Sequence, residues 1–333
     1  MSFDVEWSYI DNGEPTAADL MFASFISAAD LDSIPEPEPL IHKTLFMNSL
    51  AWLIGRPGHG KSFIAIDLAA HIALGETWAG CPTKKGKVMY LVAEGGSGIR
   101  ERIRTWEDAS GQWIGHQMML KTAAVQVMDS TAWAAFVEAT ARLGPVLVVV
   151  DTQARVTVGM EENSAKEMGM FVSRLDHLRL ATGACVLVVH HQGRGDGEHM
   201  RGSTAMDGAA DTVIGVKKVD TEVRLECLKQ KEAAAFEPLL FRLVEHAPSA
   251  YASLISDDTH LSLDTPMISM SLKRWWDSDE TDWVSASYLV ETEIFAKATF
   301  HRIKKSLIRR GAVEEKGEGQ AKRYRLLHEP YNL

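Results

Sequence analysis

Eight consecutive residues have the types and the spacing of a phosphate-binding loop. They fit the pattern G-x-x-x-x-G-K-[ST] and are Gly55, Arg56, Pro57, Gly58, His59, Gly60, Lys61 and Ser62. In such a loop, glycines let backbone N–H groups surround phosphate oxygens, the lysine reaches the terminal phosphates and the serine hydroxyl ligates Mg²⁺. The sequence therefore predicts that residues 55–62, with the adjoining Phe63, bind the phosphates of a nucleotide and that Ser62 is a metal ligand.

Two carboxylates follow other apolar runs of the chain. Asp151 comes after residues 146–150, where a carboxylate can hold Mg²⁺ through water. Glu94 comes after residues 87–93 and is a candidate for polarising the attacking water, although a helix-capping role is the alternative. Because open α/β sheets bind ligands at the carboxyl ends of their strands, we expect both carboxylates near the phosphate-binding loop.

The elements that position these residues alternate between strand-like and helical patterns. This alternation is typical of a doubly wound, mostly parallel sheet in an α/β fold. The predicted strands are 50–54, 87–93, 125–128, 146–150 and 184–189. The predicted helices are 63–74, 98–106, 132–143 and 165–181. Three further strand-like runs lack helical crossovers, which predicts an antiparallel extension of the sheet, and they are 211–218, 224–229 and 239–244.

Four segments follow from composition and punctuation. They are an acidic N-terminal segment and lead-in at 1–44, an ATPase-like core at 45–246, a linker at 247–266 and a small domain at 267–333. The last segment shows helical patterns and then a glycine-containing hairpin, which is typical of a winged helix. Its helices are predicted at 268–276, 285–290 and 297–310, and its hairpin strands at 312–315 and 322–327.

Charge is distributed unevenly along the 333 residues, whose net charge is -10. Residues 1–44 hold nine acidic residues against one basic residue, whereas residues 297–333 hold ten basic against four acidic, a local charge of +6. A basic winged helix is a candidate DNA-binding surface, and docking to another protein is the alternative. The predicted DNA-binding residues of this domain are Arg302, Lys305, Arg309, Lys322 and Arg323.

The order and spacing of these motifs resemble the RecA/DnaB superfamily, specifically the plasmid RepA-like hexameric replicative helicases and their phage relatives. The resemblance spans residues 39–244 and rests on the motifs at 55–62, 88–94, 146–155, 186–192 and 201–203. It implies a RecA-like fold that hydrolyses ATP with Mg²⁺. It also implies that Glu94 is the catalytic glutamate, Asp151 the magnesium aspartate and His191 the γ-phosphate sensor, with His190 as the alternative.

In the resembled ring ATPases the nucleotide lies between neighbouring subunits. A cation from the next subunit then stabilises the charge that develops on the transferred phosphoryl group. Lys229 and Lys231 resemble the paired fingers of ring helicases, and Arg201 is a further candidate. The place where some members carry an arginine finger is occupied here by Asp211.

Two loops resemble those that grip single-stranded DNA in the central channel of a ring. They are residues 154–164 and 192–202, in which Arg155, Arg194 and Arg201 can contact phosphates, although acidic residues dilute their charge. The resemblance therefore implies single-stranded or forked DNA as partner, a homo-oligomer, usually a hexamer, and contacts with a primase, a loader or another replication protein.

The leading hypothesis is a ring-forming replicative DNA helicase. A recombination or annealing ATPase is one alternative, and a nucleotide-gated promoter-binding regulator is another. A third is a metal-dependent nuclease for branched DNA, built from His190, His191, Asp196, Glu198 and His199. A composition of 46% hydrophobic and 24% charged residues excludes a disordered or fibrous chain, and the absence of a long apolar run predicts a cytoplasmic protein without membrane contact.

Overall fold

The computed structural model describes residues 15–93, 96–191, 204–220, 222–255, 275, 283–292, 313–317 and 322–326. The chain divides into the units Met1–Glu38 and Pro39–Leu333. In the first unit, α1 (Ala17–Ala23) begins with a capping box in which Thr16 and Asp19 bond to each other's backbone N–H groups, and η1 (Ala28–Ser33) follows it. Every described side chain of this unit is exposed.

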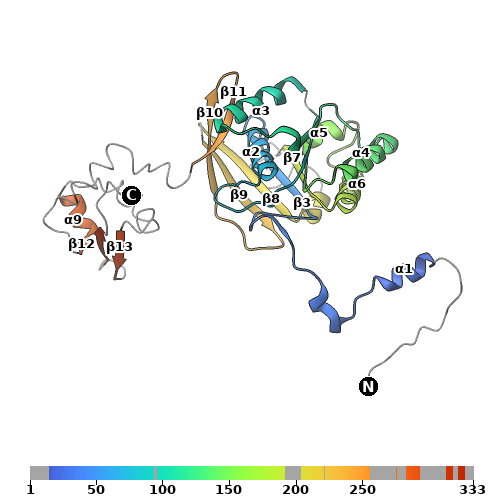
Figure 1. Cartoon of the computed structure of the whole chain (residues 1–333), viewed down its shortest axis with the longest axis horizontal. Helices are drawn as coiled ribbons and strands as arrows, with labels where there is room; N and C mark the ends of the chain where they lie inside the picture. Colours follow the sequence, from blue (N-terminus) through green and yellow to red (C-terminus); the bar gives the residue numbers. More distant parts are fainter. Residues whose placement is uncertain are drawn as a thin grey trace. The chain divides into compact units, whose positions relative to one another are not determined.

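A nine-stranded sheet forms the body of the second unit (Figure 1). Its strand order is β11-β10-β9-β8-β3-β7-β6-β4-β5. The six strands that pair in parallel are β8 (Thr212–Val219), β3 (Leu50–Gly55), β7 (Cys185–His191), β6 (Leu147–Asp151), β4 (Val88–Val92) and β5 (Met118–Lys121). The three that continue it in antiparallel pairing are β9 (Glu222–Gln230), β10 (Leu239–His246) and β11 (Ser249–Leu254). The predicted mostly parallel sheet with an antiparallel extension is confirmed.

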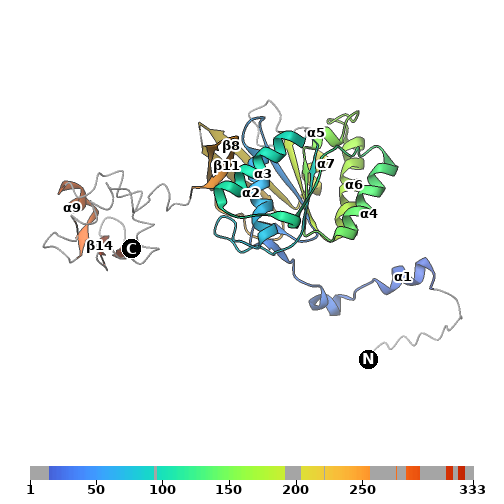
Figure 2. The same ribbon diagram turned by 45° about the horizontal axis from the view of Figure 1, so that its top comes forward.

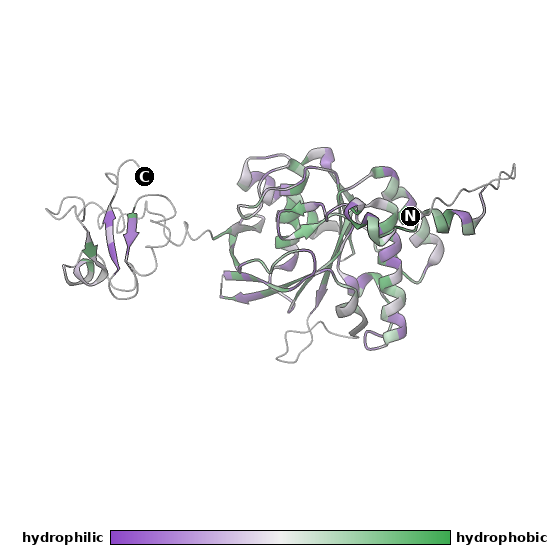
Figure 3. Cartoon of the chain, turned by 90° about the horizontal axis from the view of Figure 1, so that it is seen from below, coloured by the Kyte–Doolittle hydropathy of each residue, from purple (hydrophilic) through white to green (hydrophobic). Residues whose placement is uncertain are grey.

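Helices cover both faces of the sheet, which explains why the central strands are apolar throughout (Figure 2). Residues of α2 (Lys61–Leu74) and α3 (Gly96–Ser110) share one hydrophobic layer with the sheet. Residues of α4 (Ser130–Leu143), α5 (Gln153–Val156), α6 (Ala165–Thr182) and α7 (Thr204–Ala209) share the other. Coloured by hydropathy, the helices that flank the sheet show both hydrophobic and hydrophilic residues along their length (Figure 3). No helix among the described residues has the length and apolar content to cross a membrane.

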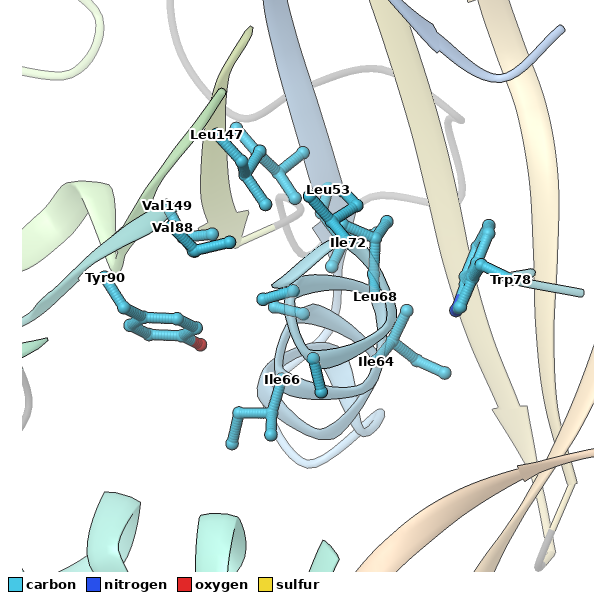
Figure 4. Packing of buried hydrophobic residues seen from close by; sticks show 14 of the residues in the cluster. Leu53, Ile64, Ile66, Leu68, Ile72, Trp78, Val88, Tyr90, Leu147 and Val149 are labelled. Carbon is cyan, nitrogen blue, oxygen red and sulfur yellow. The ribbon is translucent and has the colours of Figure 1, made fainter. Parts of the chain in front are cut away.

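Helix α2, which follows the phosphate-binding loop, is buried on most of its circumference. Ile64, Leu68 and Ile72 are fully buried against the sheet, and Val88 and Tyr90 of β4 lie in the same layer (Figure 4). The helix ends at Gly75, whose φ of 77° allows its N–H group to bond to the carbonyls of His71 and Ile72. This burial fixes the start of α2 relative to the sheet.

The prediction of a strand at 125–128 is wrong. The edge strand is β5, and η2 (Gly115–Gln117) precedes it. Val125 and Val127 are nevertheless buried, because they pack into the layer that contains α4 and α6, and the Val127 N–H group bonds to the Val156 carbonyl. An apolar alternation thus marks burial here without marking a strand.

Two predicted boundaries also differ from the structure. The compact unit starts at Pro39 rather than at residue 45, because β1 (Pro39–Ile41) pairs with β2 (Leu45–Phe46) and buries Leu40 and Ile41. The predicted linker at 247–266 contains β11, which pairs with β10 in the sheet. β1 and β2 are only three and two residues long, and β11 mixes serines with apolar residues, so none of them shows an apolar run of ordinary strand length.

Part of the predicted winged helix lies in described residues. A three-stranded sheet of order β12-β14-β13 consists of β12 (Val284–Ser285), β14 (Arg323–Leu326) and β13 (Val313–Lys316). Its hairpin β13–β14 and the helix α9 (Ala286–Glu291) confirm the predicted hairpin and the helix at 285–290. The predicted helix at 297–310 lies outside the described residues, as does that at 268–276 apart from Trp275, so the winged helix stays a prediction.

Candidate nucleotide-binding site

The phosphate-binding loop joins β3 to α2 and requires glycine at three positions. A Cβ atom at Gly55 would lie 2.4 Å from the carbonyl oxygen of Val216, so only glycine permits this approach of β3 to β8. Gly58 and Gly60 have φ angles of 77° and 85°, a backbone region that other L-residues rarely adopt. The loop therefore has the backbone conformation that a turn around a phosphate group needs.

Lys61 is held inside this loop. The residue is only 5% exposed, and its ammonium group donates hydrogen bonds to the carbonyls of Gly55 (2.8 Å) and Arg56 (2.9 Å). Its Nζ atom also lies 3.3 Å from Nδ1 of His191. The structure thus brings together two residues that are 130 positions apart in the sequence and that were both predicted to face the terminal phosphate.

His59 holds the loop against β8 from the other side. Its Nδ1 atom lies 3.2 Å from the Val216 carbonyl and 3.4 Å from the Lys218 backbone N–H nitrogen. The tautomer of the ring decides which of the two bonds forms. Either bond connects the loop to β8, the strand next to β3, so β8 supports the loop conformation.

The parallel register places the other predicted residues at the same edge of the sheet. His191 pairs with Gly55, and Asp151 pairs with Val189 of β7 and Val92 of β4. By strand alternation His191 and Asp151 share the face of Val189 and Val149, which is the face that α2 covers. The loop, His191 and Asp151 therefore converge where ligands bind in open α/β sheets.

His190 points away from this site. It is 1% exposed and lies on the opposite face of β7, with the residues that pack against α6. Consecutive residues of a strand point to opposite faces of the sheet, so His190 and His191 cannot bind the same metal ion. The nuclease hypothesis depends on this histidine pair. Asp196, Glu198 and His199 lie outside the described residues.

Asp151 ends β6 as a buried carboxylate, 6% exposed. The hydroxyl group of Tyr90 donates a hydrogen bond of 2.8 Å to its Oδ2 atom. Burial, followed by the negative charge of Asp151, raises the pKa of Tyr90 well above its usual value, so the hydroxyl remains protonated and acts as the donor. Tyr90 was not predicted as a site residue, although a tyrosine in a buried strand usually has a polar partner.

Phe63, the predicted binding residue after Ser62, contacts Arg102 of α3. Phe63 follows Ser62 in the first turn of α2, and the guanidinium carbon of Arg102 lies 5.0 Å from the centre of its ring. The charge of Arg102 also acts on Tyr90, where it lowers the pKa against the larger effects of burial and Asp151. Glu94, the predicted catalytic glutamate, lies outside the described residues.

Lys229 and Lys231 lie far from the loop of their own chain. Lys231 forms a 2.9 Å ion pair with Asp211, and Asp211 accepts a bond from the backbone N–H of Leu50, the first residue of β3. Lys229 contacts the carbonyl of Gly208 at 3.4 Å. Both lysines are thus at the amino end of β3, whereas the loop follows its carboxyl end.

The predicted DNA-binding residues are described only in part. Arg155 is exposed on α5, directly after the strand that carries Asp151. Lys322 pairs with Glu315, and Arg323 lies in β14 of the small hairpin. The remaining predicted residues lie outside the described part, and they are Arg194, Arg201, Arg302, Lys305 and Arg309.

The donor set fits a nucleotide and Mg²⁺. Positive-φ glycines and a buried lysine suit phosphate oxygens, while a serine hydroxyl at the start of a helix and a buried carboxylate supply the oxygen ligands that Mg²⁺ prefers. No cluster of three or more His, Cys, Asp or Glu side chains that could hold another metal occurs within the described ranges.

An apolar cavity among the described residues lies elsewhere. It has a volume of about 800 Å³ between β5 and α4, and its lining includes Met119, Val125 and Phe136. None of the predicted site residues lines it, and its walls are mainly aliphatic. Its chemistry therefore does not match that of a phosphate site.

A family model described as an AAA domain matches residues 15–197. The match spans more than half of the chain and includes the phosphate-binding loop, Asp151 and His191. The comparison with curated proteins returned no matching relative. The chain therefore belongs to the AAA domain family and has the fold of a P-loop ATPase.

Proposed function

We propose that this chain is an ATP-hydrolysing DNA motor that works as a ring-forming, hexameric replicative DNA helicase on single-stranded or forked DNA. The ATPase part of the proposal is supported by the 3.3 Å distance between Nζ of Lys61 and Nδ1 of His191. The phosphate-binding loop follows β3, and His191 ends the neighbouring strand β7. A histidine at this place can respond to the loss of the terminal phosphate and pass the change to the loop that follows β7.

Hydrolysis is a direct attack of water on the γ-phosphate. In this proposal Lys61 balances the negative charge of the terminal phosphates and Ser62 and Asp151 hold Mg²⁺. Bound Mg²⁺ supplies further charge stabilisation at the phosphate oxygens. Glu94 orients the attacking water, and the backbone N–H groups of the loop fix the phosphates in position.

The ring part of the proposal rests on the positions of Lys229 and Lys231. Five residues of strand separate the start of β3 from Gly55, which is about 17 Å at about 3.3 Å per residue. A cation bonded near the start of β3 is therefore too distant to stabilise phosphate in its own subunit. A neighbouring subunit that presents these lysines completes the site, and Arg155 and the loop at 192–202 face DNA.

ATP turnover tests this proposal when it is measured across protein concentration, with and without single-stranded DNA, together with the light-scattering mass at each point. We expect steep concentration dependence, a closed oligomer and stimulation by DNA, followed by strand separation of a forked duplex. Flat turnover by a monomer that ignores DNA would contradict the motor. An open filament whose length follows that of the DNA would instead support the recombination ATPase.

Glu94→Gln separates binding from chemistry. We expect the variant to bind ATP normally and to hydrolyse it roughly 100-fold more slowly, because an amide cannot accept the proton of the attacking water. Filter binding and phosphate release measure the two properties. Near-normal turnover would show that another group acts as the base.

A further inference from the structure

The hydrogen bond between Tyr90 and Asp151 crosses from one strand to the next. Val92 is the cross-strand partner of Asp151, and Tyr90 precedes Val92 by two residues on the same face of β4. Tyr90 is thus a diagonal neighbour of Asp151 across the parallel pair of β4 and β6, and its long aromatic side chain spans this separation. The phenol therefore reaches the carboxylate along the sheet, and its hydroxyl lies 2.8 Å from Oδ2.

Nothing in the packing of β4 alone requires a hydroxyl at this position. Val88 and Val92 precede and follow Tyr90 on the same face, and all three side chains belong to one apolar layer. Figure 4 shows Val88 and Tyr90 in this layer beside Val149. A phenylalanine would fill this space equally well. The polar atom of Tyr90 is therefore explained by its partner, because buried hydroxyl groups are retained where they form hydrogen bonds.

A carboxylate rotates easily about its terminal bond, since this torsion is broad and nearly two-fold. A hydrogen bond to Oδ2 fixes the plane of the Asp151 carboxylate and thereby the direction of its lone pairs. Groups that orient metal ligands in this way commonly change metal affinity by about 10- to 100-fold when they are removed.

We propose that Tyr90 is a positioning residue for the metal site, which sets the orientation of the Asp151 carboxylate toward Mg²⁺ at the phosphate-binding loop. This inference rests on the proposed binding of Mg²⁺ and nucleotide at that loop. The proposal adds Tyr90 of β4 to the residues of the nucleotide site, which otherwise come from the loop, β6 and β7.

The test uses Tyr90→Phe in the full chain and a fluorescent ADP analogue as the probe. Affinity is measured with Mg²⁺ and with EDTA, and Mn²⁺ binding in the presence of ADP is followed by electron paramagnetic resonance. We expect unchanged affinity in EDTA and a Mg²⁺-dependent gain that is about 10-fold smaller than in the wild type, with Mn²⁺ bound correspondingly more weakly.

Trp78→Phe is the matched control. The Trp78 indole donates a 2.8 Å hydrogen bond to Asp67, another buried carboxylate in the same layer, which lies inside α2 and away from the loop. This variant should lower the melting temperature and leave the Mg²⁺-dependent gain unchanged. If Tyr90→Phe likewise lowers only the melting temperature and changes the gain less than twofold, Tyr90 is a packing residue and the proposal is wrong.

A second pair of variants keeps the test valid if Tyr90→Phe folds poorly. When the hydroxyl serves Asp151, its removal should lower the melting temperature less in an Asp151→Ala background, where no side-chain oxygen is left to accept its hydrogen bond. Equal losses in both backgrounds would contradict the proposal. A wild-type protein whose ADP affinity is the same in Mg²⁺ and EDTA would contradict the proposed function instead, so the two failures are distinguishable.

Discussion

A lysine lies near each end of β3, Lys61 of α2 at the carboxyl end and Lys231 after β9 at the amino end, and the environments of the two differ. At the carboxyl end Lys61 is buried and bonds to carbonyl oxygens of Gly55 and Arg56, which orient the ammonium group without neutralising its charge. At the amino end Lys231 is about 42% exposed in its side chain and bonds to the carboxylate of Asp211. The first arrangement suits an anionic ligand held inside the subunit, and the second suits a cation that is presented at the surface.

This difference explains why one chain holds only part of the proposed site. Every described residue predicted to face phosphate or Mg²⁺ lies at the carboxyl end, whereas the predicted fingers lie at the other end, about 17 Å away along the strand. In the proposed ring a single subunit can therefore bind the nucleotide, but rapid hydrolysis requires a second subunit.

The largest expected effect is that of Lys61→Ala at the carboxyl end. Loss of a charged hydrogen bond worth about 3 kcal/mol should weaken nucleotide binding roughly 100-fold and abolish turnover. Isothermal titration with ADP and Mg²⁺ measures the affinity. Lys229→Ala is the control and should bind as the wild type does, and equal losses in both variants would remove the distinction between the two ends.

The next effect concerns Lys231→Ala at the amino end. In the manner of other trans-acting cations, its loss should slow hydrolysis roughly 1000-fold with nucleotide affinity unchanged. Because the Lys231–Asp211 pair is partly exposed, stability should change by less than about 1 kcal/mol. Phosphate release and thermal denaturation check the two statements, and unimpaired turnover would exclude Lys231 as a finger.

Gly55→Ala tests the backbone at the carboxyl end. The added Cβ would meet the Val216 carbonyl at 2.4 Å, so the loop or β8 must shift, and we expect a loss of about 1–3 kcal/mol in the free energy of unfolding. Gly169→Ala in α6 is the opposite control, because its Cβ meets nothing within 4 Å and alanine favours a helix by about 0.5–1 kcal/mol. Urea denaturation of both variants should show changes of opposite sign.

The smallest effect concerns a buried thiol at the amino end. Burial, opposed by a hydrogen bond from Ser49 and reinforced by Asp211, raises the pKa of Cys185 to about 12. The thiol therefore stays neutral in the folded state, while in the unfolded state it ionises with its ordinary pKa of 9.0. Its contribution to stability is present below pH 9 and falls as the pH rises toward 12.

Alkylation at pH 8 followed by mass spectrometry measures this prediction. Cys185 should remain unmodified in the native protein, whereas the half-buried Cys81 and Cys227 react. In denaturant all three should react. Rapid native modification of Cys185 would show that the amino end of the sheet opens more readily than its packing indicates.

Sequence predicted the carboxyl end of the sheet better than its surroundings. A glycine pattern between an apolar strand and a helix has few structural solutions, so Lys61 and the loop were located from the sequence. His191 was assigned from the family resemblance, with His190 as the alternative. Tyr90 was missed because its role depends on the register between β4 and β6, which pairs residues 59 positions apart and leaves no local pattern.

The edges of the fold were harder to predict for a related reason. β5 exposes three of its four residues, and β11 is half-buried throughout most of its length, so neither shows the apolar run of a central strand. Residues 125–128 show a strand-like apolar alternation because Val125 and Val127 are buried in a helix-containing layer. In the centre of this sheet the paired strands are also the buried segments. At its edges, paired strands are partly exposed and some buried residues belong to no strand.

A mixing experiment tests the division of the site between subunits most directly. Lys61→Ala retains the amino end and Lys231→Ala retains the carboxyl end, so neither should hydrolyse ATP alone. Random assembly of equal amounts should give intact pairs at about one quarter of the interfaces, and turnover should recover to about that fraction. A mixture that light scattering shows to be assembled, and that remains inactive, would contradict a site completed by a neighbouring subunit.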